Sequence, residues 1–68
     1  MLRLTLERQR RGLSQAALAR MTGIHPAAIS QLEGGKTHPW PGWKNRLGRA
    51  LDMPGDRLFE EVDVEHHA

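Results

Sequence analysis

The 68-residue sequence contains no cysteine, which excludes disulfide bridges and cysteine-ligated zinc sites. Aromatic residues are scarce: there are two tryptophans, one phenylalanine and no tyrosine. No apolar run reaches the roughly 18 residues of a transmembrane helix, and the amino-terminal stretch MLRLTLERQRRG is too charged for a secretory signal. These absences predict a soluble protein of a reducing compartment, most simply the cytoplasm.

A chain of this length forms one small domain, which leaves little room for the large cleft that most enzymes need. The acidic residues are scattered, so no nucleophile, base and orienting residue can be combined, and no glycine-rich phosphate loop is present. His66 and His67 are adjacent and can bind nickel or copper adventitiously, but a structural metal site needs further rigid ligands. We therefore predict no enzyme, cofactor, metal or small-molecule substrate.

Charge is unevenly distributed along the chain. Residues 1–57 contain all ten Lys and Arg and four acids, a net +6, whereas residues 58–68 contain four acids and no Lys or Arg, a net −4. The basic body favours a polyanionic partner such as nucleic acid, although an ordinary mixed-charge surface fits the total of +2 equally well. The acidic end is expected to be solvated or to contact a basic partner.

Hydrophobic spacing and helix-capping residues predict five short helices and no strand. The third helix is expected to bury Ile29 and Leu32. The expected helices cover residues 2–10, Ser14 to Gly23, His25 to Gly34, Pro41 to Leu51, and a segment after Met53 that carries Leu58, Phe59 and Val62. We expect one domain over residues 1–62, followed by an acidic, frayed tail over residues 63–68.

The expected core is small and draws on every helix. Its members are Leu6, Leu13, Leu18, Met21, Ile24, Ile29, Leu32, Trp43, Leu47, Leu51 and Leu58. Burial of each large side chain stabilises the fold by about 1.5–3 kcal/mol. The total free energy gained from this core therefore barely exceeds the cost of the conformational entropy lost on folding. Oligomerisation would supply additional stability. Trp40 is expected at the edge of the core, where it extends the stripe of the fourth helix, or at an interface.

The segment from Gln15 to Gly34 carries the functional information. Two helices joined by Thr22-Gly23-Ile24 form a helix-turn-helix, in which Ala19 permits close crossing and Gly23 permits a left-handed turn. The string GLSQAALARMTGIHPAAISQLEGGKTHP resembles the Cro/repressor-type (Xre-like) helix-turn-helix proteins. The resemblance runs from about Arg8 to Phe59 and rests on Gly12-Leu13-Ser14-Gln15, Leu18-Ala19, Gly23-Ile24, Ile29-Ser30, Leu32-Glu33, Gly35-Lys36, Pro39 and Leu51.

This resemblance implies an all-α, lambda-repressor-like fold and a sequence-specific DNA-binding regulator, usually a homodimer on a two-fold operator. The third helix would enter the major groove of double-stranded DNA. Its base-facing residues would be His25, Pro26, Ala27, Ser30 and Gln31. Because this set contains no Arg, Lys or Asn, direct readout is expected to be limited and DNA shape to add specificity.

The resemblance also implies contacts that support the third helix. Arg8 and Glu33 match a family salt bridge; the alternative is a solvated glutamate. The expected DNA-backbone contacts are Gln15, Lys36, Thr37, His38 and Lys44. A merely flexible polar loop is the alternative for residues 36–38, and the position of Lys44 is usually apolar in the family.

The corner between the fourth and fifth helices forms the dimer contact in the family. Its counterpart here is Met53, Pro54, Arg57, Leu58 and Phe59. Alternatively, Phe59 only completes the core of the monomer. A rival function is a protein-interaction module such as an antitoxin or adaptor, in which the tail from Glu60 to Glu65, with Val62 and Val64, covers a protein partner.

Overall fold

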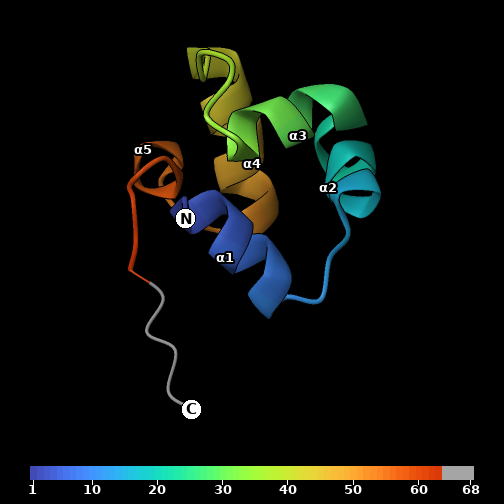
Figure 1. The fold of residues 1–68 in the computed structure, drawn as a ribbon. Helices are drawn as coiled ribbons and strands as arrows, with labels where there is room; N and C mark the ends of the chain where they lie inside the picture. Colours follow the sequence, from blue (N-terminus) through green and yellow to red (C-terminus); the bar gives the residue numbers. More distant parts are fainter. Residues whose placement is uncertain (64–68) are drawn as a thin grey trace.

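The computed structural model describes residues 1–63, and this part of the chain is all-helical, as predicted. Figure 1 shows the five helices α1 (Arg3–Arg10), α2 (Gln15–Thr22), α3 (Pro26–Glu33), α4 (Pro41–Leu51) and α5 (Gly55–Leu58). Within residues 1–63 the only strand-like pairing is an isolated antiparallel bridge between Leu2 and Glu61. None of the helices described there has the length and hydropathy needed to cross a membrane.

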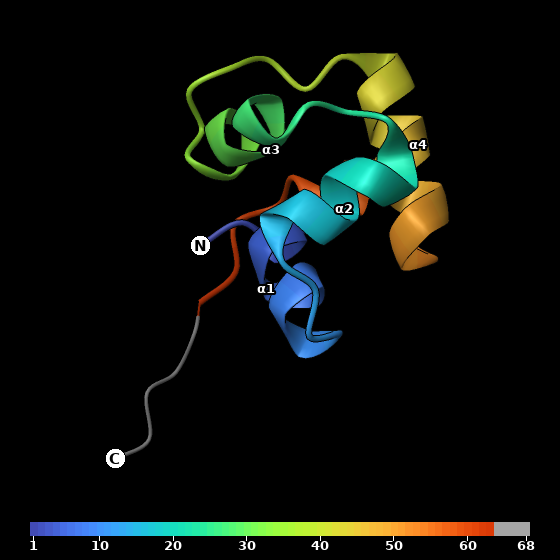
Figure 2. The same ribbon diagram turned by 90° about the vertical axis from the view of Figure 1, so that its right-hand side faces the viewer.

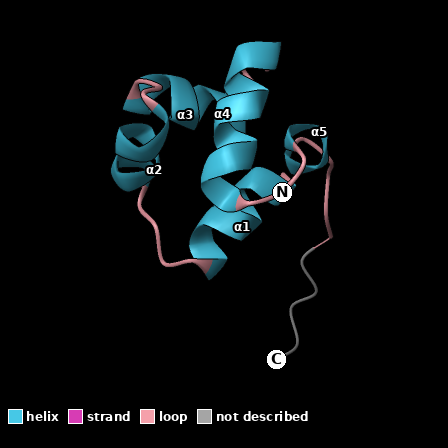
Figure 3. Cartoon of the chain, turned by 180° about the vertical axis from the view of Figure 1, so that it is seen from behind, coloured by secondary structure: helices cyan, strands magenta, loops and turns pink. Residues whose placement is uncertain are grey.

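The longest helix, α4, connects the two halves of the molecule. It packs against α2 on one side and α5 on the other (Figure 3). Helix α3 runs across α2, to which a short turn joins it (Figure 2). The helix-turn-helix is therefore held by α4, while α1 and α5 close the opposite side of the core.

Local capping signals explain where α2 begins and ends. The Ser14 hydroxyl oxygen accepts a 3.0 Å hydrogen bond from the backbone N–H of Ala17, which satisfies one of the free donors of the first turn. Gly23 ends the helix in the left-handed conformation with φ of 72°, a region that disfavours side chains. Both ends were predicted from the sequence.

The core is as small as expected, but its membership differs from the prediction. The buried apolar residues are Leu4, Leu18, Ala19, Ile24, Ile29, Leu32, Leu47, Leu51 and Leu58. Leu13 and Trp43 pack against this core while partly exposed. Two predicted members are wrong: Leu6 is only half-buried, and Met21 is 53% exposed.

Both errors have the same physical cause, a polar residue on the buried face of a helix. In α1 the inward positions are Leu4 and Glu7, so Leu6 is turned aside. In α2 the buried position is Thr22, not Met21. The Thr22 hydroxyl donates to the Leu18 carbonyl oxygen at 2.8 Å and accepts a hydrogen bond from the Ile24 backbone N–H at 3.2 Å. These two bonds offset the cost of burying the hydroxyl group.

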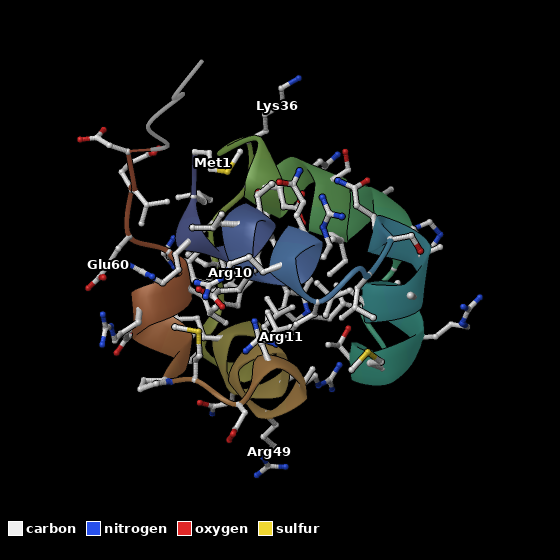
Figure 4. The ribbon with its side chains drawn as sticks, turned by 90° about the horizontal axis from the view of Figure 1, so that it is seen from below. Met1, Arg10, Arg11, Lys36, Arg49 and Glu60 are labelled. Atoms are coloured by element: carbon white, nitrogen blue, oxygen red, sulfur yellow. The ribbon has the colours of Figure 1, made fainter. Side chains whose placement is uncertain are left out.

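The buried Glu7 carboxylate is surrounded by arginines. Arg11 Nη1 lies 2.6 Å from Glu7 Oε1, and guanidinium groups of Arg10 and Arg3 lie 3.3 and 3.6 Å from Oε2. The hydrogen bond from Arg11 outweighs burial and lowers the pKa of Glu7 below its ordinary value. Arg11 also donates to the Leu51 carbonyl oxygen at 2.7 Å, so this cluster fastens α1 to the end of α4 (Figure 4).

Two glycines set the distance between α4 and α5. A Cβ atom on Gly48 would lie 2.6 Å from the Met53 carbonyl oxygen, and one on Gly55 would collide with the Lys44 carbonyl group. The absence of side chains at these two positions therefore permits the close approach of the two helices.

The fifth helix is shorter than predicted. It ends at Leu58, Phe59 caps it, and Val62 lies beyond it. Residues 60–62 instead run beside the amino terminus, because Arg3 N–H donates to the Glu60 carbonyl and Val62 N–H donates to the Met1 carbonyl, at 2.9 and 2.8 Å. The rest of the expected tail, residues 64–68, lies outside the described residues, and with it Val64, Glu65, His66 and His67.

Candidate nucleic-acid interface

Helix α3 has one buried side and one exposed side. Ile29 and Leu32 are buried against the other helices. The five predicted base-facing residues are all exposed: His25, Pro26, Ala27, Ser30 and Gln31. The structure therefore brings the candidate reading residues together on solvent-facing positions of α3 and its N-cap. The side chains of Ala27 and Ser30 are short, so a binding partner could approach the helix backbone closely there.

His25 has a local role that the sequence analysis did not predict. Its ring nitrogen Nδ1 accepts a 3.1 Å hydrogen bond from the backbone N–H of Ala27 and so caps α3. With Nδ1 used as an acceptor, Nε2 carries the proton of the neutral ring. His25 can therefore offer one N–H donor, from Nε2, to a base or a phosphate.

The carboxylate of Glu33 joins three helices at the C-terminal end of α3. Arg8 donates to both carboxylate oxygens, from Nε at 2.7 Å and Nη2 at 3.0 Å, and Gln15 donates to Oε1 at 3.1 Å. The Arg8 and Glu33 side chains are only 12% and 7% exposed, so Glu33 is not a solvated residue. The hydrogen bond to Glu33 raises the pKa of Arg8 above its ordinary value.

This arrangement fixes the orientation of α3 relative to α1 and α2. Arg8 also donates from Nη1 to the Leu13 carbonyl oxygen at 2.8 Å, which holds the chain just before α2. Gln15 uses one amide N–H for Glu33 and has a second that can reach a ligand. Gln15 thus braces α3 and keeps one amide N–H that Glu33 does not use.

The loop after α3 folds back onto the end of that helix. Gly35 adopts φ of 70°, and the Lys36 backbone N–H donates to the Gln31 carbonyl oxygen at 2.8 Å. Lys36 is therefore held beside Gln31, with its side chain exposed. Thr37 is half-buried and His38 is exposed, so these three residues form a polar edge next to the C-terminal end of α3.

Trp40 lies outside the core. It is 57% exposed, and its ring packs edge-on against His38 with 4.7 Å between the ring centroids. The expectation that Trp40 extends the buried stripe of α4 is wrong. Helix α4 begins only at Pro41, so Trp40 precedes the helix and its side chain stays in the loop.

Lys44 lies apart from the other predicted backbone contacts. Its ammonium nitrogen is 2.9 Å from an Asp56 carboxylate oxygen and 6.0 Å from the centre of the Phe59 ring. These contacts place Lys44 on the side of α4 that faces α5, where its charge is already neutralised. The predicted phosphate contact of Lys44 therefore gains no support from its position.

The predicted dimer corner divides into buried and exposed residues. Leu58 is 0% exposed and is the one buried residue of the single-turn helix α5. It is therefore a core residue and cannot contact a second subunit. Met53 and Phe59 are half-buried against the core, whereas Pro54 and Arg57 are exposed. Next to them, Asn45, Arg49 and Asp52 line an open depression.

The distribution of ion pairs reveals basic residues that the sequence analysis missed. Six of the ten Lys and Arg residues have a carboxylate within 4.0 Å. Among residues 1–63, the four without such a partner are Arg20, Lys36, Arg46 and Arg49. A sequence signal existed for Arg20 and Arg46, because neither has an acidic residue three or four positions away on its helix.

Comparison with known families agrees with the helix-turn-helix fold. A family model described as a helix-turn-helix domain matches residues 2–60, which includes all five helices. The match is consistent with the resemblance to Cro/repressor-type proteins. No curated protein and no solved structure matches the chain.

Proposed function

The chain belongs to the helix-turn-helix domain family, and we propose that it is a sequence-specific DNA-binding regulator that represses transcription by occupying an operator. The observation that carries this proposal is the fixed, exposed α3. The buried Arg8–Glu33–Gln15 contact holds the helix, and every predicted reading residue is exposed. Because α3 is already held in one orientation, it can enter the major groove without a further entropy cost for ordering the helix.

Base reading through α3 is proposed to be sparse. Gln31 can form two hydrogen bonds to an adenine, and Ala27 can contact a thymine methyl group. His25 offers its Nε2 N–H group, as its Nδ1 is committed to the helix cap. Lys36, Thr37, His38 and Gln15 are proposed to contact the sugar-phosphate backbone. With so few base contacts, the operator sequence would be distinguished in part by its shape and deformability.

We further propose a homodimer on a two-fold operator. Pro54 and Arg57 are the exposed residues of the predicted corner, with Met53 and Phe59 beside them. The two copies of α3 would then read half-sites about one helical turn of DNA, roughly 34 Å, apart. The domain is proposed to cover residues 1–62, with the acidic residues 63–68 outside it. Within residues 1–63, the structure offers no observation in favour of the rival function, a protein-interaction module.

Selection of DNA from a random library by the parent protein tests the proposal. Fluorescence anisotropy on the selected sequence would then compare the parent with Gln31→Ala, and with Gln9→Ala as a control on the exposed side of α1. We expect Gln31→Ala to lose about 1–3 kcal/mol of binding and its preference at one base pair, and Gln9→Ala to bind like the parent. If the parent enriches no sequence, specific DNA binding is wrong.

A further inference from the structure

We propose that Arg20 and Arg46 form a second phosphate-contact surface, which binds the DNA strand on the opposite wall of the major groove from Lys36. This inference rests on the proposed function and adds residues outside the recognised contacts of α3 and its loop. Three features of the structure support it: the free charge of these arginines, their place next to α3, and their distance from Lys36.

Arg20 and Arg46 carry charge that the protein itself does not neutralise. Both are exposed, and neither lies within 4.0 Å of a carboxylate among the described residues. The arginines of α1 differ, since Arg3, Arg10 and Arg11 all surround Glu7. An unpaired guanidinium group presents several N–H donors in a planar fork that suits phosphate oxygens.

Both arginines lie near the turn of the helix-turn-helix. Arg46 Nη1 lies 4.0 Å from the position that a Cβ atom on Gly23 would occupy. Arg20 precedes Gly23 by three residues and belongs to the last turn of α2. Two residues after Gly23, His25 caps the start of α3. Both arginines therefore lie near the turn that leads into the N-terminal end of α3.

The backbone contacts predicted from the sequence lie at the other end of α3. Gln15 is bonded to Glu33, and Lys36 is bonded to Gln31. Helix α3 has eight residues, so its two ends are about 12 Å apart. This length is close to the width of the major groove, about 12 Å. Free cations at both ends of α3 would thus face phosphates on both walls of the groove.

Helix α4 carries a second exposed arginine, Arg49, on the side of the molecule opposite Lys36. Arg49 follows Arg46 by one turn and also lacks a carboxylate partner within residues 1–63. Figure 4 shows Lys36 and Arg49 projecting from opposite sides of the molecule. The alternative occupant of this surface is the acidic segment of a second copy. DNA is favoured because Glu60 and Glu61 are engaged by Arg57 and the amino terminus.

The salt dependence of DNA binding tests this surface. Fluorescence anisotropy at several salt concentrations would use the DNA selected by the parent, with the variants Arg20→Gln, Arg46→Gln and the double variant. Each lost phosphate contact should reduce the slope of log K against log salt by about 0.9, while the preferred sequence stays the same. The control is Arg10→Gln, an exposed arginine on α1 that removes the same charge and should keep the parent's slope.

The outcomes separate this inference from the proposed function. If the parent binds its selected DNA and both variants keep the parent's slope, the second surface is wrong while DNA binding stands. If the variants keep that slope but lose self-association in sedimentation, the occupant is a second copy, which also overturns the inference. If the parent binds no DNA, both proposals fail. Thermal unfolding of each variant should match the parent, since Arg20 and Arg46 are exposed.

Discussion

Two largely buried carboxylates organise the side chains of this small domain. Glu7 connects α1 with α4 through Arg11, and Glu33 connects α3 with α1 and α2 through Arg8 and Gln15. Each is surrounded by donors, which offsets the cost of removing its charge from water. Because the part of the chain that the structure describes has only nine buried apolar residues, these polar contacts fix how the helices are oriented.

Removal of the Glu33 charge should be costly because it leaves Arg8 without a partner. Glu33→Gln is expected to destabilise the fold by about 3 kcal/mol, since Arg8 is only 12% exposed. The double variant Arg8→Met/Glu33→Met should recover much of this loss. Urea unfolding of the parent, Arg8→Met, Glu33→Met and the double variant measures the coupling. Additive effects in this cycle would contradict the role given to the ion pair.

Glu7 should make the stability of the protein sensitive to acid. Because its pKa in the folded state lies below its ordinary value of 4.5, the stabilisation is complete above that value and is lost as the pH falls below it. At neutral pH, Glu7→Gln should cost about 2 kcal/mol, discounted for the exposure of its arginine partners. Urea unfolding from pH 7 to pH 3 should show the difference between parent and variant shrinking in acid.

The control for this measurement is Glu61→Gln, since the Glu61 side chain is 77% exposed. We expect a change below about 0.5 kcal/mol. A difference between parent and Glu7→Gln that stays constant down to pH 3 would show that the carboxylate charge is not the source of the stabilisation.

The capping residues Ser14, Gly23 and Gly35 were predictable and the cap by His25 was not, while the buried faces of α1 and α2 were only partly predictable. Ser14, Gly23 and Gly35 act through their neighbours in the chain, so the sequence contains the whole signal. Glu7 is buried among arginines three and four residues away, and Thr22 through a local hydroxyl hydrogen bond, and apolar spacing registers neither. The sequence pattern therefore assigned Leu6 and Met21 to positions that polar residues occupy.

The contact between α4 and α5 depends on glycine and gives a prediction with a matched control. Gly48→Ala should destabilise the fold by about 1–3 kcal/mol, because the new Cβ atom would lie 2.6 Å from the Met53 carbonyl oxygen, which belongs to the backbone and cannot swing away. Gly42→Ala lies on the same helix with nothing within 4 Å. It should stabilise the fold by about 0.5 kcal/mol through helix propensity.

Thermal or urea unfolding of the two variants measures the change in stability that each substitution causes. Equal effects of Gly48→Ala and Gly42→Ala would mean that α4 and α5 are not held as closely as described. Sequence alone could not rank these glycines, since both lie within the predicted fourth helix. The difference between them comes from the one-turn α5 that crosses only Gly48.

At the scale of the whole molecule, the sequence located one end of the candidate site better than the other. The residues at the C-terminal end of α3 lie within one continuous motif, so Gln15, Lys36 and Thr37 could be proposed from the resemblance. Arg46 comes close to Gly23, in the turn before α3, only because α4 packs against α2. That proximity is a property of the tertiary structure, whereas the sequence shows only that Arg46 has no acidic residue three or four positions away on its helix.

Folding and association should be separable at the corner between α4 and α5. Arg57→Glu changes an exposed residue, so the midpoint of unfolding of the isolated monomer should be almost unchanged while repulsion across a two-fold interface breaks the proposed dimer. Leu58→Ala removes a fully buried side chain and should cost about 2–5 kcal/mol in unfolding experiments. Sedimentation velocity over a range of concentrations measures the association of each variant. If Arg57→Glu associates like the parent, the interface lies elsewhere on the molecule. The distance between the two copies of α3 would then differ, and the half-site spacing of the operator would change with it.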